Sequence, residues 1–313
     1  MKTRISIIIA TIVLVAGFIS FYGCQKDNTT ASVNSTVTAN ELTSSTDDAA
    51  VSEISDNITQ EAENTASDLD SKGYPMAVKS LETGQCTTIA IDHPNDSTYF
   101  PKVITIVYGG CSDSVVSSRT GTIKITITGR YWNNESERTI QFINFTVNGF
   151  RINGTKTVTN KGFVSGLLTW DVTDTFAVRF PDTITTITRN WARTRVLQTP
   201  VTYDNTVTSL NLFKRYWRNN WWHALYSVTG NGTGTNRFGD ALSMTTVSPL
   251  YFRRGCKHVL AGDELLTNTT KDRKVETNWG VDPTVKCSMN DITVTITDSL
   301  NHVVVKHPGH WEW

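Results

Sequence analysis

The sequence predicts an all-β fold, an antiparallel and hairpin-rich sandwich or sheet, with one short helix in an acidic leader ahead of it. The main observation is alternation of apolar and polar residues along short segments. In segment 122–128 three isoleucines alternate with Lys124 and Thr126, and the same period returns at 292–296. A period of two with many β-branched residues is typical of half-buried strands.

Turn signals separate these segments, which is the second observation. Asn-Gly pairs favour type I′ hairpin turns because both central residues accept positive φ. Strands of about 6–10 residues joined by such turns predict antiparallel hairpins. The turn signals are Gly109-Gly110, Asn148-Gly149, Asn153-Gly154, Lys161-Gly162 and Asn231-Gly232.

Residues 1–23 are expected to be a secretion signal peptide. Lys2 and Arg4 give a positive start, and residues 5–19 form an almost unbroken apolar run. This run is shorter than the roughly 20 residues that span a bilayer as a helix, so it favours a signal core. An uncleaved signal anchor is the alternative.

The residues after the apolar run resemble a lipobox, Phe21-Tyr22-Gly23-Cys24. Gly23 fits the small residue before the cysteine, whereas Phe21 and Tyr22 depart from the usual Leu and Ala or Ser. The next four residues, Gln-Lys-Asp-Asn, resemble the Bacteroidota lipoprotein export signal. The resemblance implies that Cys24 carries palmitate-type acyl chains and that the protein is displayed on the outer face of the cell outer membrane. Each buried CH₂ contributes about 0.8 kcal/mol, so such an anchor is stable.

The leader from Cys24 to residue 71 is acidic, and the body, residues 72–313, is mildly basic. The body has 26 basic and 19 acidic residues, a net charge of +7. Our first interpretation of the leader is a flexible, solvated tether with a short helix near 46–69. The alternative is that the leader screens a basic face of the body, or that this face meets an anionic surface. The acidic residues between Lys26 and Lys72 are Glu41, Asp47, Asp48, Glu53, Asp56, Glu61, Glu63, Asp68 and Asp70.

Five cysteines are present, and four remain if Cys24 carries lipid. An even number in an oxidising compartment favours disulfides. We predict the pairs Cys86–Cys111 and Cys256–Cys287, each of which brackets a hairpin-sized segment, and the other two pairings stay open. A zinc site is disfavoured because no pair has CxxC spacing.

The body is expected to be one β-rich domain, with the alternative of two duplicated modules at about 80–180 and 181–313. In each half two cysteines precede an alternating Thr-rich strand, at 121–128 and at 291–297. Such a repeat is typical of duplication, but Thr-rich strands also resemble one another by composition alone.

From residue 86 to 297 the chain resembles a group of Bacteroidota outer-membrane or surface lipoproteins known mainly as hypothetical proteins. The resemblance rests on strand and turn features, so it implies a fold and no chemistry, and the tail 307–313 departs from it. The segments that carry it are 100–106, Cys111, 121–125, 145–149, 153–160, 228–237 and 254–256.

An aromatic segment at 216–222 is the candidate ligand site. Exposed tryptophans can stack on sugar rings while neighbouring polar groups donate hydrogen bonds. Packing in the core is the alternative, since large aromatic residues are usually buried. The candidate residues are Tyr216, Trp217, Arg218, Asn219, Trp221 and Trp222.

Gly230, Gly232 and Gly234 are expected to line one face of a strand and to leave a shallow groove. Either a ligand fills this groove or, more commonly, a neighbouring aromatic such as Trp221 does.

No catalytic motif or cofactor fingerprint was found, so no catalytic residue, metal or cofactor is predicted. His302, His307 and His310 are interpreted as exposed and unliganded; a transition-metal site is the alternative. The basic residues are scattered, which gives no support to nucleic-acid binding.

These observations predict an envelope lipoprotein anchored to the outer membrane that acts as a binding or structural module. The favoured partner is a glycan, and the alternative partner is another envelope protein. The alternatives are a polysaccharide-directed hydrolase and a purely structural envelope component.

Overall fold

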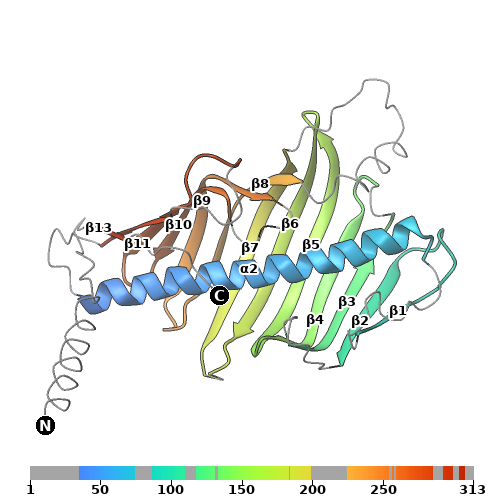
Figure 1. Ribbon diagram of the computed structural model, residues 1–313, viewed down its shortest axis with the longest axis horizontal. Helices are drawn as coiled ribbons and strands as arrows, with labels where there is room; N and C mark the ends of the chain where they lie inside the picture. Colours follow the sequence, from blue (N-terminus) through green and yellow to red (C-terminus); the bar gives the residue numbers. More distant parts are fainter. Residues whose placement is uncertain are drawn as a thin grey trace, which may run out of the picture. The chain divides into compact units, whose positions relative to one another are not determined.

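The computed structural model describes residues 35–74, 87–109, 118–130, 133–182, 184–198, 224–253, 256, 259–284, 292–298 and 303–306. Residues Val33–Trp313 form one compact unit. Within it the described strands form a single antiparallel sheet of thirteen strands in sequence order, crossed by one long helix, α2 (Figure 1).

The strands have the following bounds: β1 Thr87–Ile91, β2 Lys102–Gly109, β3 Arg119–Ile127, β4 Glu137–Val147, β5 Phe150–Val164, β6 Leu167–Arg179, β7 Thr186–Leu197, β8 Leu225–Thr235, β9 Ala241–Arg253, β10 Ala261–Asn268, β11 Arg273–Asn278, β12 Thr293–Thr297 and β13 Val303–Lys306. The all-β fold class with an N-terminal helix is therefore confirmed. The turn Asn148-Gly149, with positive φ at both residues, joins β4 to β5 as the sequence predicted.

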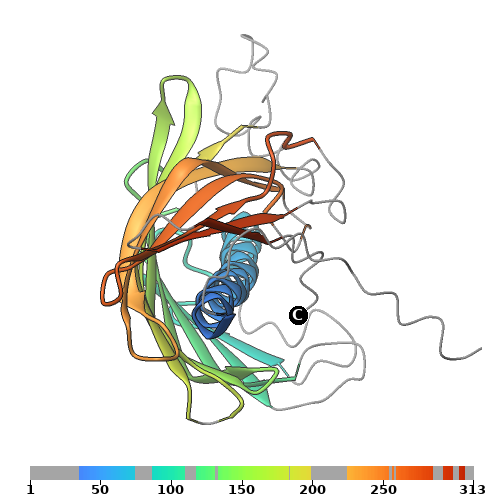
Figure 2. The same ribbon diagram turned by 90° about the vertical axis from the view of Figure 1, so that its left-hand side faces the viewer.

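The sheet curves around α2, which lies against its concave face (Figure 2). The alternation of each strand explains this layering. On β3, Ile123, Ile125 and Ile127 are fully buried, while Lys124 and Thr126 on the other face are partly exposed. Because successive side chains of a strand point to opposite faces, one face is buried under α2 and the Thr-rich face meets water.

Helix α2 spans Ser35–Ser71, 37 residues or about 55 Å at 1.5 Å per residue. It is longer than the 46–69 helix that the sequence predicted. The expectation of a solvated tether is wrong over this range, because Asp47, Asp48 and Glu63 are all less than 6% exposed. Its Ser, Thr and Asp residues are weak helix formers, so contacts with the sheet must hold it in place.

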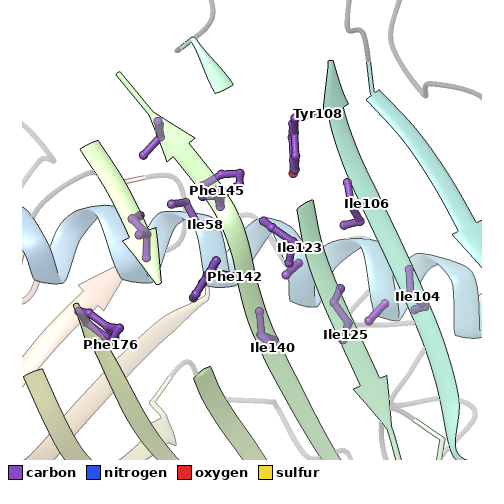
Figure 3. Close-up of a cluster of buried hydrophobic side chains, with 14 of the residues drawn as sticks. Ile58, Ile104, Ile106, Tyr108, Ile123, Ile125, Ile140, Phe142, Phe145 and Phe176 are labelled. Atoms are coloured by element: carbon purple, nitrogen blue, oxygen red, sulfur yellow. The ribbon is translucent and has the colours of Figure 1, made fainter. Parts of the chain in front are cut away.

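The main hydrophobic cluster joins α2, from Val51 to Leu69, to β1–β7. Figure 3 shows Ile58 of α2 among isoleucines and phenylalanines of the sheet. The helix residues of this cluster are Val51, Ile58, Ala62, Ala66 and Leu69, each at most 2% exposed. This half of the leader is thus part of the core.

A second hydrophobic cluster lies under the later strands, with Trp191, Met244, Leu266 and Val294 among its buried members. Among the described side chains of α2, Leu42 alone packs against it, and it is partly buried. Among its described side chains, α2 therefore has far less apolar contact before Val51 than from Val51 onward.

The module boundary expected near residue 180 falls between β6 and β7. These strands pair from Thr169↔Val196 to Arg179↔Thr186, so the sheet is continuous across it. Duplication of the two halves stays a prediction. No described helix is both long and apolar enough to cross a membrane.

If α2 is part of the core, truncating Ile58 must destabilise the sheet. We expect Ile58→Ala to lower the free energy of unfolding by about 2–5 kcal/mol, since it removes a buried side chain and leaves a cavity. Urea denaturation followed by circular dichroism measures this. The matched control is Ile184→Ala, at a side chain that is 88% exposed, where the change should stay within about 0.5 kcal/mol. Equal stability of both variants would mean that α2 is not docked in solution.

Candidate binding surface on the concave face of the sheet

The acidic residues of α2 face basic residues that project from the concave side of the sheet. Each pair joins a leader carboxylate to a cation of the body. The pairs are Glu41–Arg273, Asp47–Arg237, Asp48–Arg189, Asp56–Lys156, Asp56–Arg193, Glu61–Arg119, Glu63–Arg138, Glu63–Arg195 and Asp70–Arg130. The arrangement corresponds to the alternative in which the leader screens a basic face.

Five of these acids recur along α2 at intervals of seven or eight residues. Glu41 and Asp48 are seven residues apart, and so are Asp56, Glu63 and Asp70 in turn. Seven residues are nearly two helical turns and advance about 10.5 Å. The cations that these acids meet lie, in helix order, on β11, on β7, on β5 and β7, on β4 and β7, and just after β3. Heptad spacing is the sequence signal that could have found these residues.

Asp48 and Arg189 form the central pair. The Arg189 guanidinium donates from Nε to Asp48, and from Nη1 to the carbonyl oxygens of Thr188 at 2.8 Å and Thr235 at 3.1 Å. Both side chains are at most 7% exposed. The pair is therefore fixed in geometry and largely withdrawn from water.

The three glycines of β8 make room for the side chains of β7. A Cβ on Gly232 would lie 2.9 Å from the Trp191 ring, one on Gly234 3.1 Å from Arg189 Nη1, and one on Gly230 3.0 Å from Arg193 Cγ. The groove expected over these glycines is thus filled by one aromatic and two arginines. The aromatic is Trp191, and Trp221, which the sequence suggested, lies outside the described residues.

Arg193 stacks on Trp191, with its Cζ 3.5 Å from the ring centroid. It also lies 3.4 Å from Asp174, which is 3.8 Å from Lys156. Lys156 in turn donates to Asp56 of α2 at 2.7 Å. Burial raises the pKa of Asp174 even though Arg193 and Lys156 oppose the shift. This group links three strands to the middle of the helix.

Glu63 is the acid that two arginines share. Arg195 Nη2 donates to both of its oxygens, at 3.0 and 3.1 Å, and Arg138 Nη2 lies 3.4 Å away. Burial alone would raise the pKa of Glu63, but the two guanidinium charges outweigh it and lower the pKa. Glu63 is therefore held as a carboxylate in the interior.

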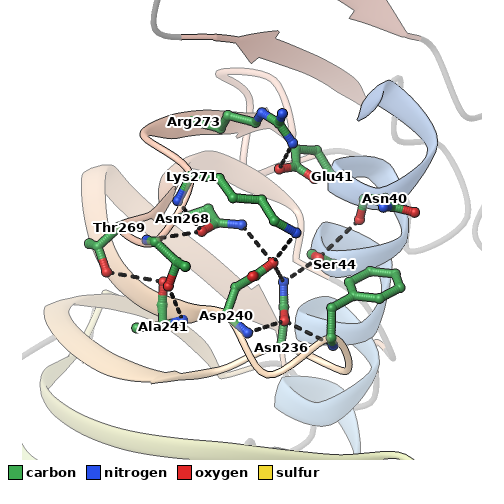
Figure 4. A network of polar contacts seen from close by, with 12 residues as sticks. Asn40, Glu41, Ser44, Asn236, Asp240, Ala241, Asn268, Thr269, Lys271 and Arg273 are labelled. Carbon is green, nitrogen blue, oxygen red and sulfur yellow. Dashed lines mark hydrogen bonds and ion pairs between the residues drawn. The ribbon is translucent and has the colours of Figure 1, made fainter. Parts of the chain in front are cut away.

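A network of polar contacts surrounds the N-terminal half of α2 (Figure 4). Asp240 accepts hydrogen bonds from Asn236 at 3.1 Å, Asn268 at 3.0 Å and Lys271 at 2.7 Å. Asn236 also donates to Ser44 of α2 at 3.1 Å. This half of the helix is thus seated mainly on hydrogen bonds and ion pairs.

Glu264 of β10 stands apart from the ion pairs. It is 8% exposed, and its Oε1 has no hydrogen-bond partner. Burial, and then the charge of Asp48, raise the pKa of Glu264 to about 8, against the opposing effect of Arg193 and Arg189. Burial therefore favours the neutral, protonated form of Glu264 in this interior.

Most residues that the sequence singled out lie outside the described residues. These are Cys24, Cys86, Cys111, Cys287, the aromatic candidates at 216–222, and His302, His307 and His310. Cys256 is disulfide-bonded, and its pairing with Cys287 stays a prediction. Among the described residues no group of His, Cys, Asp and Glu is arranged to hold a metal ion.

No family model, curated protein or solved structure matches this chain. The resemblance to Bacteroidota lipoproteins therefore stays a prediction, and function must be argued from the geometry alone.

The Asp48–Arg189 pair gives a test of the buried ion pairs. Asp48→Leu leaves a buried guanidinium without its main partner and should cost about 3–5 kcal/mol of unfolding free energy. Adding Arg189→Met should restore most of this loss, because an apolar pair of similar size is near neutral. Urea denaturation measures both variants. The exposed pair Lys161–Glu135 is the control, and Lys161→Met should cost at most about 1 kcal/mol. A small effect of Asp48→Leu would show that water replaces the lost partner.

Glu264 predicts a pH dependence of stability. Its pKa rises from 4.5 in the unfolded chain to about 8, so the folded chain holds an extra proton between these values. The stability that Glu264 contributes is full below pH 4.5 and is lost as the pH rises through 8, at up to about 1.4 kcal/mol per pH unit. Glu264→Gln should remove this component from the pH profile of the unfolding free energy. The exposed Glu276→Gln should leave it in place, and parallel profiles for all three proteins would contradict the assignment.

Proposed function

We propose that this protein is an envelope lipoprotein, anchored through a lipid on Cys24, that binds an anionic envelope polymer such as an acidic glycan. Its receptor surface is the row of cations on the concave face of the sheet. Helix α2 is the built-in acidic occupant of that surface.

The observation that carries the proposal is the match between the helix and the cation row. The carboxylates of α2 recur about every 10 Å and meet cations from β3 to β11. A polymer with a regularly repeated carboxylate or phosphate offers the same chemistry along a line. Arginine suits both groups because its planar fork binds them in a bidentate manner.

The energetics favour displacement of the carboxylates in the N-terminal part of α2 by anions of a ligand. A buried ion pair gains little net free energy, because desolvation offsets the Coulomb attraction. Among the described side chains of residues 39–50, Leu42 alone packs at the edge of a hydrophobic cluster. Replacing Glu41, Asp47 and Asp48 by ligand anions therefore forms ion pairs similar to those that are lost. The apolar part of α2 stays in the core.

The anchor would hold this surface close to the membrane. Cys24 precedes Ser35, the first residue of α2, by eleven positions. At about 3.3–3.6 Å per residue this chain spans at most about 40 Å. Once α2 is docked, these eleven residues alone set the largest distance between the membrane and the start of the helix.

A purely structural envelope component is the second candidate. The five core residues of α2 favour it, because they make half of the leader a permanent part of the fold. The two candidates differ in whether the cations of β7–β11 accept an external anion.

The test is binding of the mature chain, from Cys24 onward with serine at this position, to a polyuronate gel and to uncharged dextran. Glu41→Gln combined with Asp47→Asn should loosen the N-terminal half of α2 and raise retention on polyuronate roughly tenfold, with loss of retention at high salt. Asp171→Asn, at an exposed acid of β6, removes charge without touching α2 and is the control. Equal retention of both variants would favour the structural candidate.

Labelling with a radioactive fatty acid, compared with Cys24→Ala, tests the anchor.

A further inference from the structure

The hairpin formed by β5 and β6 extends beyond the strands on either side of it. Pairing of β5 with β4 ends at Thr159, and pairing of β6 with β7 begins at Thr169. Past these points β5 and β6 continue to pair with each other as far as Val164↔Leu167. The tip therefore projects from the end of the sheet (Figure 1).

This projecting tip is apolar and exposed. Residues 163–167 are all exposed, and Phe163, Val164 and Leu167 keep 43%, 49% and 41% of their surface accessible. Val164 and Leu167 face each other across the hairpin, and such an exposed apolar pair on one projection is unusual, because exposed apolar residues of a soluble domain are normally scattered.

The two strands of the tip pair with each other and are joined by a tight turn. Ser165 and Gly166 have positive φ, at 52° and 81°, which are the signs of a type I′ turn. The facing residues Phe163↔Leu168 and Val164↔Leu167 are paired across the hairpin. The tip is therefore a preformed projection, and the outward-facing peptide groups that none of the described strands pairs suit the hydrated lipid interface and not the hydrocarbon core.

We propose that the β5–β6 tip, defined as residues 163–167, inserts into the lipid interface of the membrane that holds the anchor. The inference rests on the proposed function, because Cys24 would place that membrane within about 40 Å of the start of α2. Tethering raises the local concentration of lipid around the tip, so a weak contact suffices.

A membrane fits the tip better than a protein partner does. The tip is convex and narrow, and a bilayer interface yields to such a shape, whereas a protein partner would need a matching groove. Lys161 next to the tip is paired with Glu135 at 2.8 Å, so the contact is apolar and does not depend on anionic lipid.

The experiment is flotation of the chain from Gln25 onward, which contains the whole compact unit, with phosphatidylethanolamine and phosphatidylglycerol vesicles. Val164→Thr combined with Leu167→Thr should reduce the bound fraction roughly tenfold or more. Val164→Trp combined with Leu167→Trp should increase it, since Trp favours the interface. Val247→Thr, at a side chain of β9 that is 56% exposed, should bind like the unchanged chain.

Absence of flotation by both the unchanged chain and the Trp variant would overturn the proposal. Flotation of the Thr variant equal to that of the unchanged chain would also overturn it. The same holds if the Thr variant still floats but loses a cross-linked protein partner. Fatty-acid labelling separates the two proposals. Labelled Cys24 without flotation removes the tip contact alone, whereas flotation without labelling removes the anchor alone.

Discussion

Charge compensation between α2 and the concave face is the constraint on which the rest of the structure depends. The sheet directs Arg138, Arg189 and Arg193 inward, and each is at most 7% exposed. A buried guanidinium without a partner costs several kcal/mol. The helix supplies the required carboxylates and lacks any basic residue before Lys72. The formal net charge of zero for the chain thus conceals two oppositely charged surfaces that neutralise each other in the interior.

These ion pairs also fix the register of the strands, which the strand sequences alone leave ambiguous. Thr-rich strands of similar pattern accept many registers, because a shift of two residues keeps the same faces inward. A fixed cation on β4, β7 or β11 meets its carboxylate on α2 in only one register. Buried polar contacts are known to select one arrangement in some proteins at little gain in stability. Here Glu63, shared by Arg138 and Arg195, ties β4 and β7 to one point of the helix.

The strands could be predicted from sequence because alternation is a local signal, as at Ile123, Ile125 and Ile127. The docking of α2 could not, since a polar helix rich in Ser, Thr and Asp has the composition of a solvated tether. Its partners lie far away in sequence, as 141 residues separate Asp48 from Arg189. The glycines of β8 were recognised as a groove, but only the register with β7 shows that Arg189, Trp191 and Arg193 fill it.

The two parts of α2 differ in whether an external ligand could displace them from the sheet. Val51, Ile58 and Leu69 are buried among apolar side chains, and no polar ligand can replace that contact. Glu41, Asp47 and Asp48 make contacts that any well-spaced anion can reproduce. An external ligand would therefore enter from the β11 side and stop where the apolar contacts begin, near Val51. The length of the exchangeable segment, about 15 Å from Glu41 to Val51, bounds the ligand to roughly two charged repeats at the spacing of the helix acids.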